Sequence, residues 1–222
     1  AWAGATARRW GAAGAAAAVA ASVRVSGVFL VMALAVLALT QAGPAKERVR
    51  RLLWLAIPVA VVAAYIGYLY TLTHSWTAWF DAQTSGWARG FATPWESLQH
   101  TLSVLEPGAY ADHPEWRWVF LAEIISMAVG LLVTLVSLVQ RRWGEATWVG
   151  VQVVAFGTSY WYMSVNRAVL LWFPLWILLG RLGEGRRKLP VWRVVLLVVL
   201  VLAALVVQAA WAWLFFTGRW AS

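Results

Sequence analysis

Five apolar runs of membrane-spanning length limit what this chain can fold into. They cover residues 25–41, 52–72, 118–139, 148–164 and 191–217. Because the hydrocarbon core of a bilayer is about 30 Å thick and takes ~20 residues of α-helix to cross, each run is expected to be a transmembrane helix. The 222-residue chain is 62% hydrophobic and only 12% charged, which leaves too few polar side chains to cover a globule in water. The sequence therefore predicts an all-α, polytopic transmembrane helical bundle.

Two shorter apolar segments, 10–23 and 168–180, are expected to add further helices to this bundle. The first is rich in alanine and glycine, whose small side chains allow helix backbones to approach closely in lipid. The second follows the fourth long run after a short polar step and is nearly long enough to return through the membrane. We therefore predict about seven helices in one transmembrane domain that covers residues 1–222.

The lysines and arginines predict an orientation, because cytoplasmic loops carry the excess of positive charge. If the basic loop at 46–51 is cytoplasmic, alternation of the spans places thirteen basic and three acidic residues on that side. The other side then has five basic and six acidic residues, so the net charge of +9 separates into +10 inside and −1 outside. The positive charge is thus a topology signal spread over several loops, and nucleic acid is excluded as a partner. We predict a multi-pass protein of the plasma (inner) membrane.

The longest loop, at 73–117, is expected on the extracytoplasmic side and to be ordered, because it is rich in tryptophan. Within it, Leu98, Leu102 and Leu105 have the spacing of a short amphipathic helix. Aromatic rings close to Asp81 and Arg89 are typical of a sugar-binding site, in which rings stack on C–H faces and polar groups bind hydroxyls. The same composition also fits an interfacial helix anchored in lipid.

Two arginines fall where predicted helices turn at the outer face. Arg167 lies between two apolar helices, where a charge is a functional hypothesis by default, and its planar guanidinium suits a phosphate or carboxylate. Arg24 lies at the end of the alanine-rich segment, so both cations can converge on one anionic group. The alternatives are an interfacial Arg167 that reaches the lipid headgroups and an Arg24 that is only a loop cation.

Other catalytic chemistries find little support in the sequence. The chain has no cysteine, which excludes disulfides and thiolate sites. His74, His100 and His113 lack the spacing of metal ligands and are expected to be solvated. Glu123 is expected to reach the membrane interface from the first turns of its helix.

Three segments resemble bacterial, especially actinobacterial, relatives of the PIG-V mannosyltransferases, which have the GT-C glycosyltransferase fold. The segment Ser164-Val-Asn-Arg167, followed by Phe173-Pro-Leu175, is similar to the family's Ser-x-Pro-Arg-Tyr and Phe-Pro-Leu motifs. The stretch at 20–27 resembles the arginine and glycine that close its alanine-rich hairpin, and the stretch at 79–95 resembles its external loop. The chain departs from the family at Asn166, which replaces proline, and at Ala168, which replaces tyrosine.

The resemblance implies transfer of mannose from a polyprenyl-phosphate-linked donor to a glycan or glycolipid acceptor on the extracytoplasmic face. Membrane lipid, the donor and the acceptor would be the partners of the chain. Arg167 and Arg24 would bind the phosphate. Five residues of the long loop would line or brace the substrate pocket: Trp79, Gln83, Trp87, Arg89 and Trp95.

The catalytic acid of the family lies upstream of the alanine-rich hairpin, where this sequence offers only residues 1–7. We therefore expect the chain to be the C-terminal portion of a longer enzyme, with Asp81 and then Asp112 as candidates for the base only if the chain is complete. No cofactor site is expected in this chain, and any divalent metal would be bound by upstream residues. Two alternatives remain: a non-catalytic membrane subunit or remnant with the same fold, and a transporter, which predicts midplane charges and internal repeats.

Overall fold

The computed structural model describes residues 1–24, 26–87, 89–182 and 190–219, and within these ranges the chain forms helices and no β-strand. Three helices are long and apolar enough to cross a membrane: Ala45–Thr73, Trp116–Val139 and Val191–Phe216. The prediction of an all-helical membrane protein is thus confirmed for the described residues. Two features of the sequence, Val25 and the part of the last basic loop at 183–189, lie outside them.

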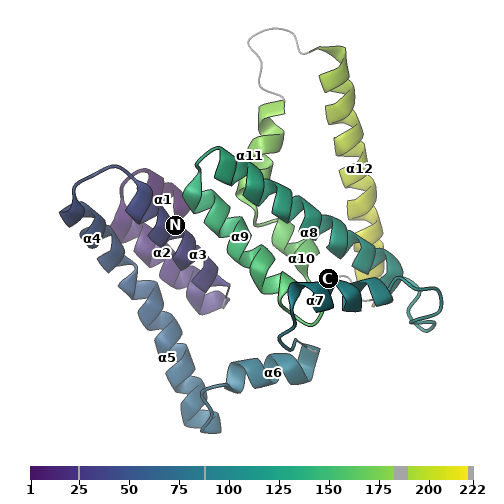
Figure 1. The fold of residues 1–222 in the computed structure, drawn as a ribbon, viewed down its shortest axis with the longest axis horizontal. Helices are drawn as coiled ribbons and strands as arrows, with labels where there is room; N and C mark the ends of the chain where they lie inside the picture. Colours follow the sequence, from purple (N-terminus) through teal and green to yellow (C-terminus); the bar gives the residue numbers. More distant parts are fainter. Residues whose placement is uncertain (25, 88, 183–189, 220–222) are drawn as a thin grey trace.

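The helices differ widely in length along the chain, from 5 residues in α1 and α10 to 26 in α12 (Figure 1). Proline or a capping side chain begins several of them, as Pro44 does for α4 and Pro190 for α12. In chain order, the helices are α1 Trp2–Thr6, α2 Trp10–Val23, α3 Gly27–Thr40, α4 Ala45–Trp54, α5 Ala56–Thr73, α6 Ala78–Trp87, α7 Pro94–Ser103, α8 Trp116–Val139, α9 Trp143–Gly157, α10 Val165–Val169, α11 Phe173–Leu182 and α12 Val191–Phe216.

The helices pack in a row in which α5 contacts α2, α2 contacts α3, α3 contacts α9, and α9 contacts α8. Small residues permit the closest of these approaches. A Cβ atom on Gly14 would lie 2.4 Å from the carbonyl oxygen of Trp54, and one on Gly27 would lie 2.5 Å from the Cα atom of Ala21. The alanine-rich segment at 10–23 is therefore a helix, as predicted, and packs through its small side chains.

Several predicted spans form helices shorter than a membrane is thick. α2 and α3 have 14 residues each and α9 has 15, so each is about 21–23 Å long at 1.5 Å per residue. The run at 148–164 becomes helical earlier than predicted, at Trp143, and its last residues leave the helix after Gly157. The segment at 168–180 is divided between α10 and α11. The short helices bring loops and turns toward the interior of the bundle, where polar groups can gather.

The long loop contains two helices, α6 and α7 (Figure 1). α7 begins with a capping box: the backbone amide of Thr93 donates to the Glu96 carboxylate (2.8 Å), and the Glu96 amide donates to the Thr93 hydroxyl (3.3 Å). The predicted helix at 96–105 is thus present, but its fully buried residues are Ser97 and Thr101, while Leu102 is exposed. Of the three leucines that gave the helical spacing, Leu98 packs against the hydrophobic core, and the buried Thr101 binds a neighbouring backbone amide.

Candidate functional site

Three arginines from distant parts of the chain gather near Ser164, at the N-terminus of α10. The Arg167 guanidinium donates to the Ser164 hydroxyl oxygen at 2.7 Å. The Arg89 guanidinium donates to the same oxygen at 3.3 Å and to the carbonyl oxygen of Met163 at 3.2 Å. Arg24, at the turn between α2 and α3, is close enough for its charge to affect Arg89. Arg24 and Arg167 are exposed and Arg89 is half-buried, so the cluster is accessible.

A buried carboxylate beneath this cluster fixes the backbone that the arginines contact. Glu123 on α8 is fully buried, and its two oxygens accept hydrogen bonds from the amides of Ser164 (2.9 Å) and Asn166 (3.0 Å). It therefore caps the first turn of α10 from another helix, where four amides lack partners within the helix. The expectation that Glu123 reaches the membrane interface was wrong.

Further polar contacts hold the same turn. The Asn166 side chain accepts a hydrogen bond from the Ser126 hydroxyl (2.8 Å) and donates to the Val119 carbonyl (3.4 Å). Ser164 has a left-handed backbone, with φ of 68°. A residue with a Cβ atom is held in that conformation at a cost of about 1–2 kcal/mol, which the bonds to Glu123 and the arginines offset.

The backbone before α10 is fixed by α7 and by the loop that carries Arg89. The hydroxyl of Thr101 accepts from the Tyr162 amide at 2.9 Å, and Nδ1 of His100 donates to the Tyr160 carbonyl at 2.9 Å. The amide of Ala92 donates to the Thr158 carbonyl at 3.0 Å. His100 is therefore a structural donor rather than a solvated loop residue, and these bonds hold the Arg89 loop against the end of α9.

The arginine cluster carries an excess of positive charge. Partial burial lowers the pKa of Arg89, the nearby charges of Arg167 and Arg24 lower it further, and Glu123 opposes them. Glu123 is the carboxylate that opposes them, and its two oxygens already accept backbone amides. An anion bound at the exposed side of Arg24 and Arg167 would relieve this repulsion.

The cluster lies at some depth along α8. Glu123 is seven residues from the first residue of that helix, which corresponds to about 10 Å at 1.5 Å per residue. A buried charge within a long apolar helix is costly unless it is paired, and Glu123 is paired with two backbone amides.

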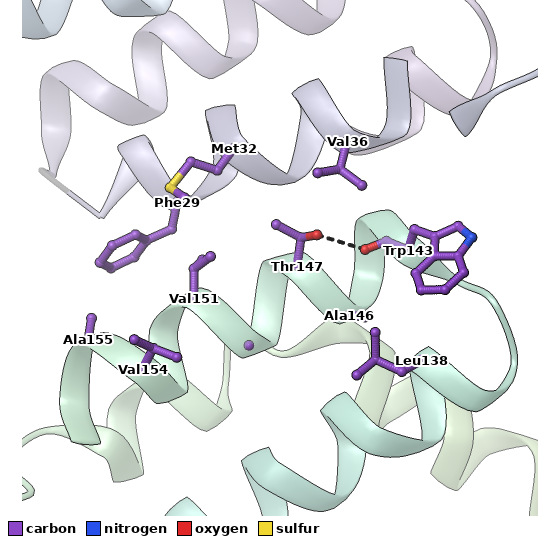
Figure 2. A pocket seen from close by; sticks show the side chains of 11 residues that line it. Phe29, Met32, Val36, Leu138, Trp143, Ala146, Thr147, Val151, Val154 and Ala155 are labelled. Atoms are coloured by element: carbon purple, nitrogen blue, oxygen red, sulfur yellow. Dashed lines mark hydrogen bonds between the residues drawn. The ribbon is translucent and has the colours of Figure 1, made fainter. Parts of the chain in front are cut away.

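An apolar groove runs between α3 and α9 (Figure 2). Its volume is about 440 Å³. Phe29 and Ala155 lie at the same end of the groove (Figure 2). In the chain, Phe29 follows shortly after Arg24, and Ala155 comes shortly before Thr158, whose carbonyl accepts from Ala92 in the Arg89 loop. The hydroxyl of Thr147 donates to the Trp143 carbonyl (2.8 Å), so it adds no unpaired polar group. The groove is lined by Phe29, Met32, Val36, Leu138, Trp143, Ala146, Thr147, Gly150, Val151, Val154 and Ala155.

The aromatic residues predicted to line a sugar pocket are spread over the surface of the long loop. Trp87 and Trp95 are 52% and 65% exposed, and Trp79 is half-buried with its ring edge-to-face on Phe80, at 5.0 Å between centroids. Gln83, on α6, is also half-buried. Of the five loop residues predicted to line or brace the substrate pocket, all within the described part of the chain, only Arg89 is joined to the Ser164 turn by hydrogen bonds.

The two aspartates proposed as alternative bases are both exposed. Asp81 accepts hydrogen bonds from the hydroxyls of Thr77 (2.9 Å) and Ser75 (3.4 Å), which precede α6 in the chain. Asp112 lies in the turns that precede α8. Among the residues that the structure describes, no three His, Asp or Glu side chains lie close enough to share a metal ion.

Sequence reasoning missed Glu123 and Ser164 as parts of this site. Glu123 is the one acidic residue within any of the five long apolar runs, and that isolation is the signal that could have identified it. Ser164 entered the sequence analysis only as the first residue of the segment at 164–167, and its role as an acceptor for two arginines depends on a left-handed turn.

Comparisons of the chain with protein-family models, with curated proteins and with solved structures found no match. The site is therefore described from the geometry of this chain alone.

Proposed function

We propose that this chain is the lipid-phosphate-binding part of a membrane glycosyltransferase. On this proposal it takes a sugar from a polyprenyl-phosphate-linked donor and transfers it to an acceptor on the extracytoplasmic face of the plasma membrane. The observation that carries the proposal is the cluster of Arg24, Arg89 and Arg167 around the Ser164 turn, with a single buried carboxylate behind it. The resemblance of the segments at 20–27 and 164–175 to GT-C mannosyltransferases indicates mannose as the sugar.

The arginines would act on the leaving group. As the bond between the sugar and the phosphate breaks, negative charge develops on the phosphate oxygens. Donors already held in place stabilise that charge more strongly in a site with little water than they would in bulk solvent. Arg167 and Arg24 are exposed and would contact the phosphate, whereas Arg89, which is bonded to Met163 and Ser164, would mainly position the turn.

The groove between α3 and α9 fits the hydrocarbon chain of such a donor. It is lined almost entirely by apolar side chains and is open to the surface, and Phe29, one of its lining residues, follows shortly after Arg24 in the chain. A polyprenyl chain in the groove would leave its phosphate beside Arg24. The apolar groove and the arginine cluster together favour a lipid-linked phosphate over a soluble phosphate as the ligand.

Glu123 is not the general base of this mechanism. Both of its oxygens accept backbone amides, and it is fully buried. The carboxylate that takes the proton of the acceptor hydroxyl would come from the part of the family fold that precedes the hairpin.

The test is transfer of labelled mannose from polyprenyl-phosphate mannose in membranes that contain this chain together with the part of the enzyme that supplies the base. Arg167→Gln is expected to abolish transfer while expression persists, and Arg117→Gln, an exposed arginine at the start of α8, is expected to retain it. Transfer that is unchanged in Arg167→Gln would remove this residue from the site. Phosphate binding without any transfer would instead favour the non-catalytic subunit.

A further inference from the structure

A second pocket lies at the opposite end of α2 from Arg24. It has a volume of about 380 Å³ and is formed where the turn before α2 meets α4. α2 has 14 residues, so about 20 Å separates this pocket from the arginine cluster described above. The pocket is therefore a different site. It is lined by Arg8, Arg9, Trp10, Gly11, Glu47, Arg50, Arg51 and Trp54.

Two charged residues of this pocket, Arg51 and Glu47, stabilise the fold. Arg51 is almost fully buried and forms an ion pair with Glu47 at 2.8 Å. Its guanidinium also donates to the carbonyl oxygens of Gln41 (2.9 Å) and Ala42 (3.0 Å), which follow the end of α3. The positive charge of Arg51 is thus neutralised by Glu47, and its donors satisfy backbone carbonyls.

The other three arginines, Arg8, Arg9 and Arg50, are exposed. Among the described residues, no carboxylate lies within ion-pair distance of any of them. The pocket therefore has a net charge of about +3 near neutral pH, because arginine stays protonated. Such a concentration of unpaired guanidinium groups is complementary to a phosphate ligand.

Arg8 is held at the pocket in an unfavourable backbone conformation. Its φ is 59°, and the turn is closed by hydrogen bonds from the Arg8 amide to Ala5 (3.1 Å) and from the Arg9 amide to Gly4 (2.7 Å). Glycine would adopt this conformation without strain, whereas arginine does not. The turn therefore places an arginine side chain at a position whose backbone conformation favours glycine.

The surroundings of the pocket indicate a lipid rather than a soluble anion. Trp54 is 42% exposed at the point where α4 joins α5, within the spanning segment Ala45–Thr73. Close to it in the same segment, Leu53, Ile57 and Val59 are exposed. Acyl chains can lie along these side chains while the headgroup occupies the pocket, as basic pockets between membrane helices bind anionic lipids.

We propose that the pocket formed by Arg8, Arg9, Arg50 and Trp54 is a binding site for the phosphate headgroup of an anionic glycerophospholipid. The bound lipid joins the α1–α2 turn to α4 and stabilises the packing of α2 against α5. The site does not depend on the proposed glycosyltransferase activity.

The test measures thermal unfolding of the full chain in detergent, with cardiolipin or with phosphatidylcholine added. Cardiolipin is expected to raise the unfolding midpoint more than phosphatidylcholine does. The double variant Arg8→Gln with Arg50→Gln is expected to weaken the apparent affinity for cardiolipin about tenfold or more. The control, Lys46→Gln with Arg48→Gln, removes the same charge from exposed positions of α4 outside the pocket and is expected to retain the effect.

Two further variants distinguish a lipid bound in this pocket from a general effect of positive charge. Arg8→Gly is expected to keep or raise the midpoint without lipid, because strain is relieved, and to reduce the response to cardiolipin. Arg117→Gln, which removes an exposed arginine outside the pocket, is expected to leave that response unchanged. The proposal is overturned if the control loses the response as much as the pocket variant does, if Arg117→Gln abolishes it, or if glycerol 3-phosphate protects the protein as strongly as cardiolipin.

Discussion

Replacement of Glu123 by glutamine tests whether the buried carboxylate holds the Ser164 turn. Glutamine has nearly the same shape, but it retains one acceptor oxygen and places an amide group, a donor, opposite the second backbone N–H. One charge-assisted hydrogen bond is lost, which is worth about 1.5–3 kcal/mol, and one buried donor is left unpaired at a similar cost. Because the bonds at 2.9 and 3.0 Å both reach amides of the same turn, Glu123→Gln is expected to destabilise the protein by about 3 kcal/mol.

For a chain of this size, a loss of 3 kcal/mol lowers the unfolding midpoint by about 6–12 °C. The midpoint can be followed in detergent by circular dichroism. Glu106→Gln changes an exposed acid in the loop before α8 and is expected to leave the midpoint within about 1 °C, because exposed substitutions seldom affect stability. If Glu123→Gln unfolds at the same temperature as this control, the carboxylate does not hold the turn and the account of the site is wrong.

Three other predictions follow from the same structure. Gly14→Ala is expected to destabilise the protein by about 2 kcal/mol, because the new Cβ would lie 2.4 Å from the Trp54 carbonyl oxygen; an unchanged midpoint would contradict the close packing of α2. Ser164→Gly is expected to be more stable than Ser164→Ala by about 1 kcal/mol, since both lose the hydroxyl but only glycine suits a φ of 68°; equal denaturation midpoints would argue against strain. The amide and then the hydroxyl of Thr93 lower the pKa of Glu96, so the capping box stabilises α7 above the ordinary pKa of glutamate and is lost as the pH falls through the lowered value. The protection of the α7 amides, taken as their exchange rate relative to the intrinsic rate at each pH, should fall only in acid, and a loss of protection toward neutral pH would contradict the assignment.

The long apolar helices could be predicted from the sequence because their signal is local. In runs such as 118–139 and 191–217, the length of the run and its scarcity of charged residues are enough to predict a membrane-spanning helix. The span predicted at 52–72 is longer in the structure, since α4 begins at Ala45 in a charged segment that a search for apolar runs does not include. Helix ends such as Gly157 depend on what packs against them, and the sequence gives no measure of that.

The candidate site could be predicted only in part. Arg24 and Arg167 were recognisable because each is a cation at a turn between apolar helices. The contact between Glu123 and the Ser164 turn joins residues about 40 positions apart, and no sequence pattern reports such a pairing. The aromatic residues of the long loop were grouped by composition, but composition does not decide whether rings gather around a site or lie on a surface.

The central claim is that the arginine cluster binds a lipid-linked phosphate, and a comparison of two ligands tests it most directly. Binding of a polyprenyl phosphate and of the matching polyprenol to the purified chain can be measured by quenching of tryptophan fluorescence. The native chain is expected to prefer the phosphate by about tenfold or more. The double variant Arg24→Gln with Arg167→Gln is expected to lose this preference, and Arg117→Gln to keep it. Equal affinity of the native chain for both ligands, or a preference that survives in the double variant, would contradict the account.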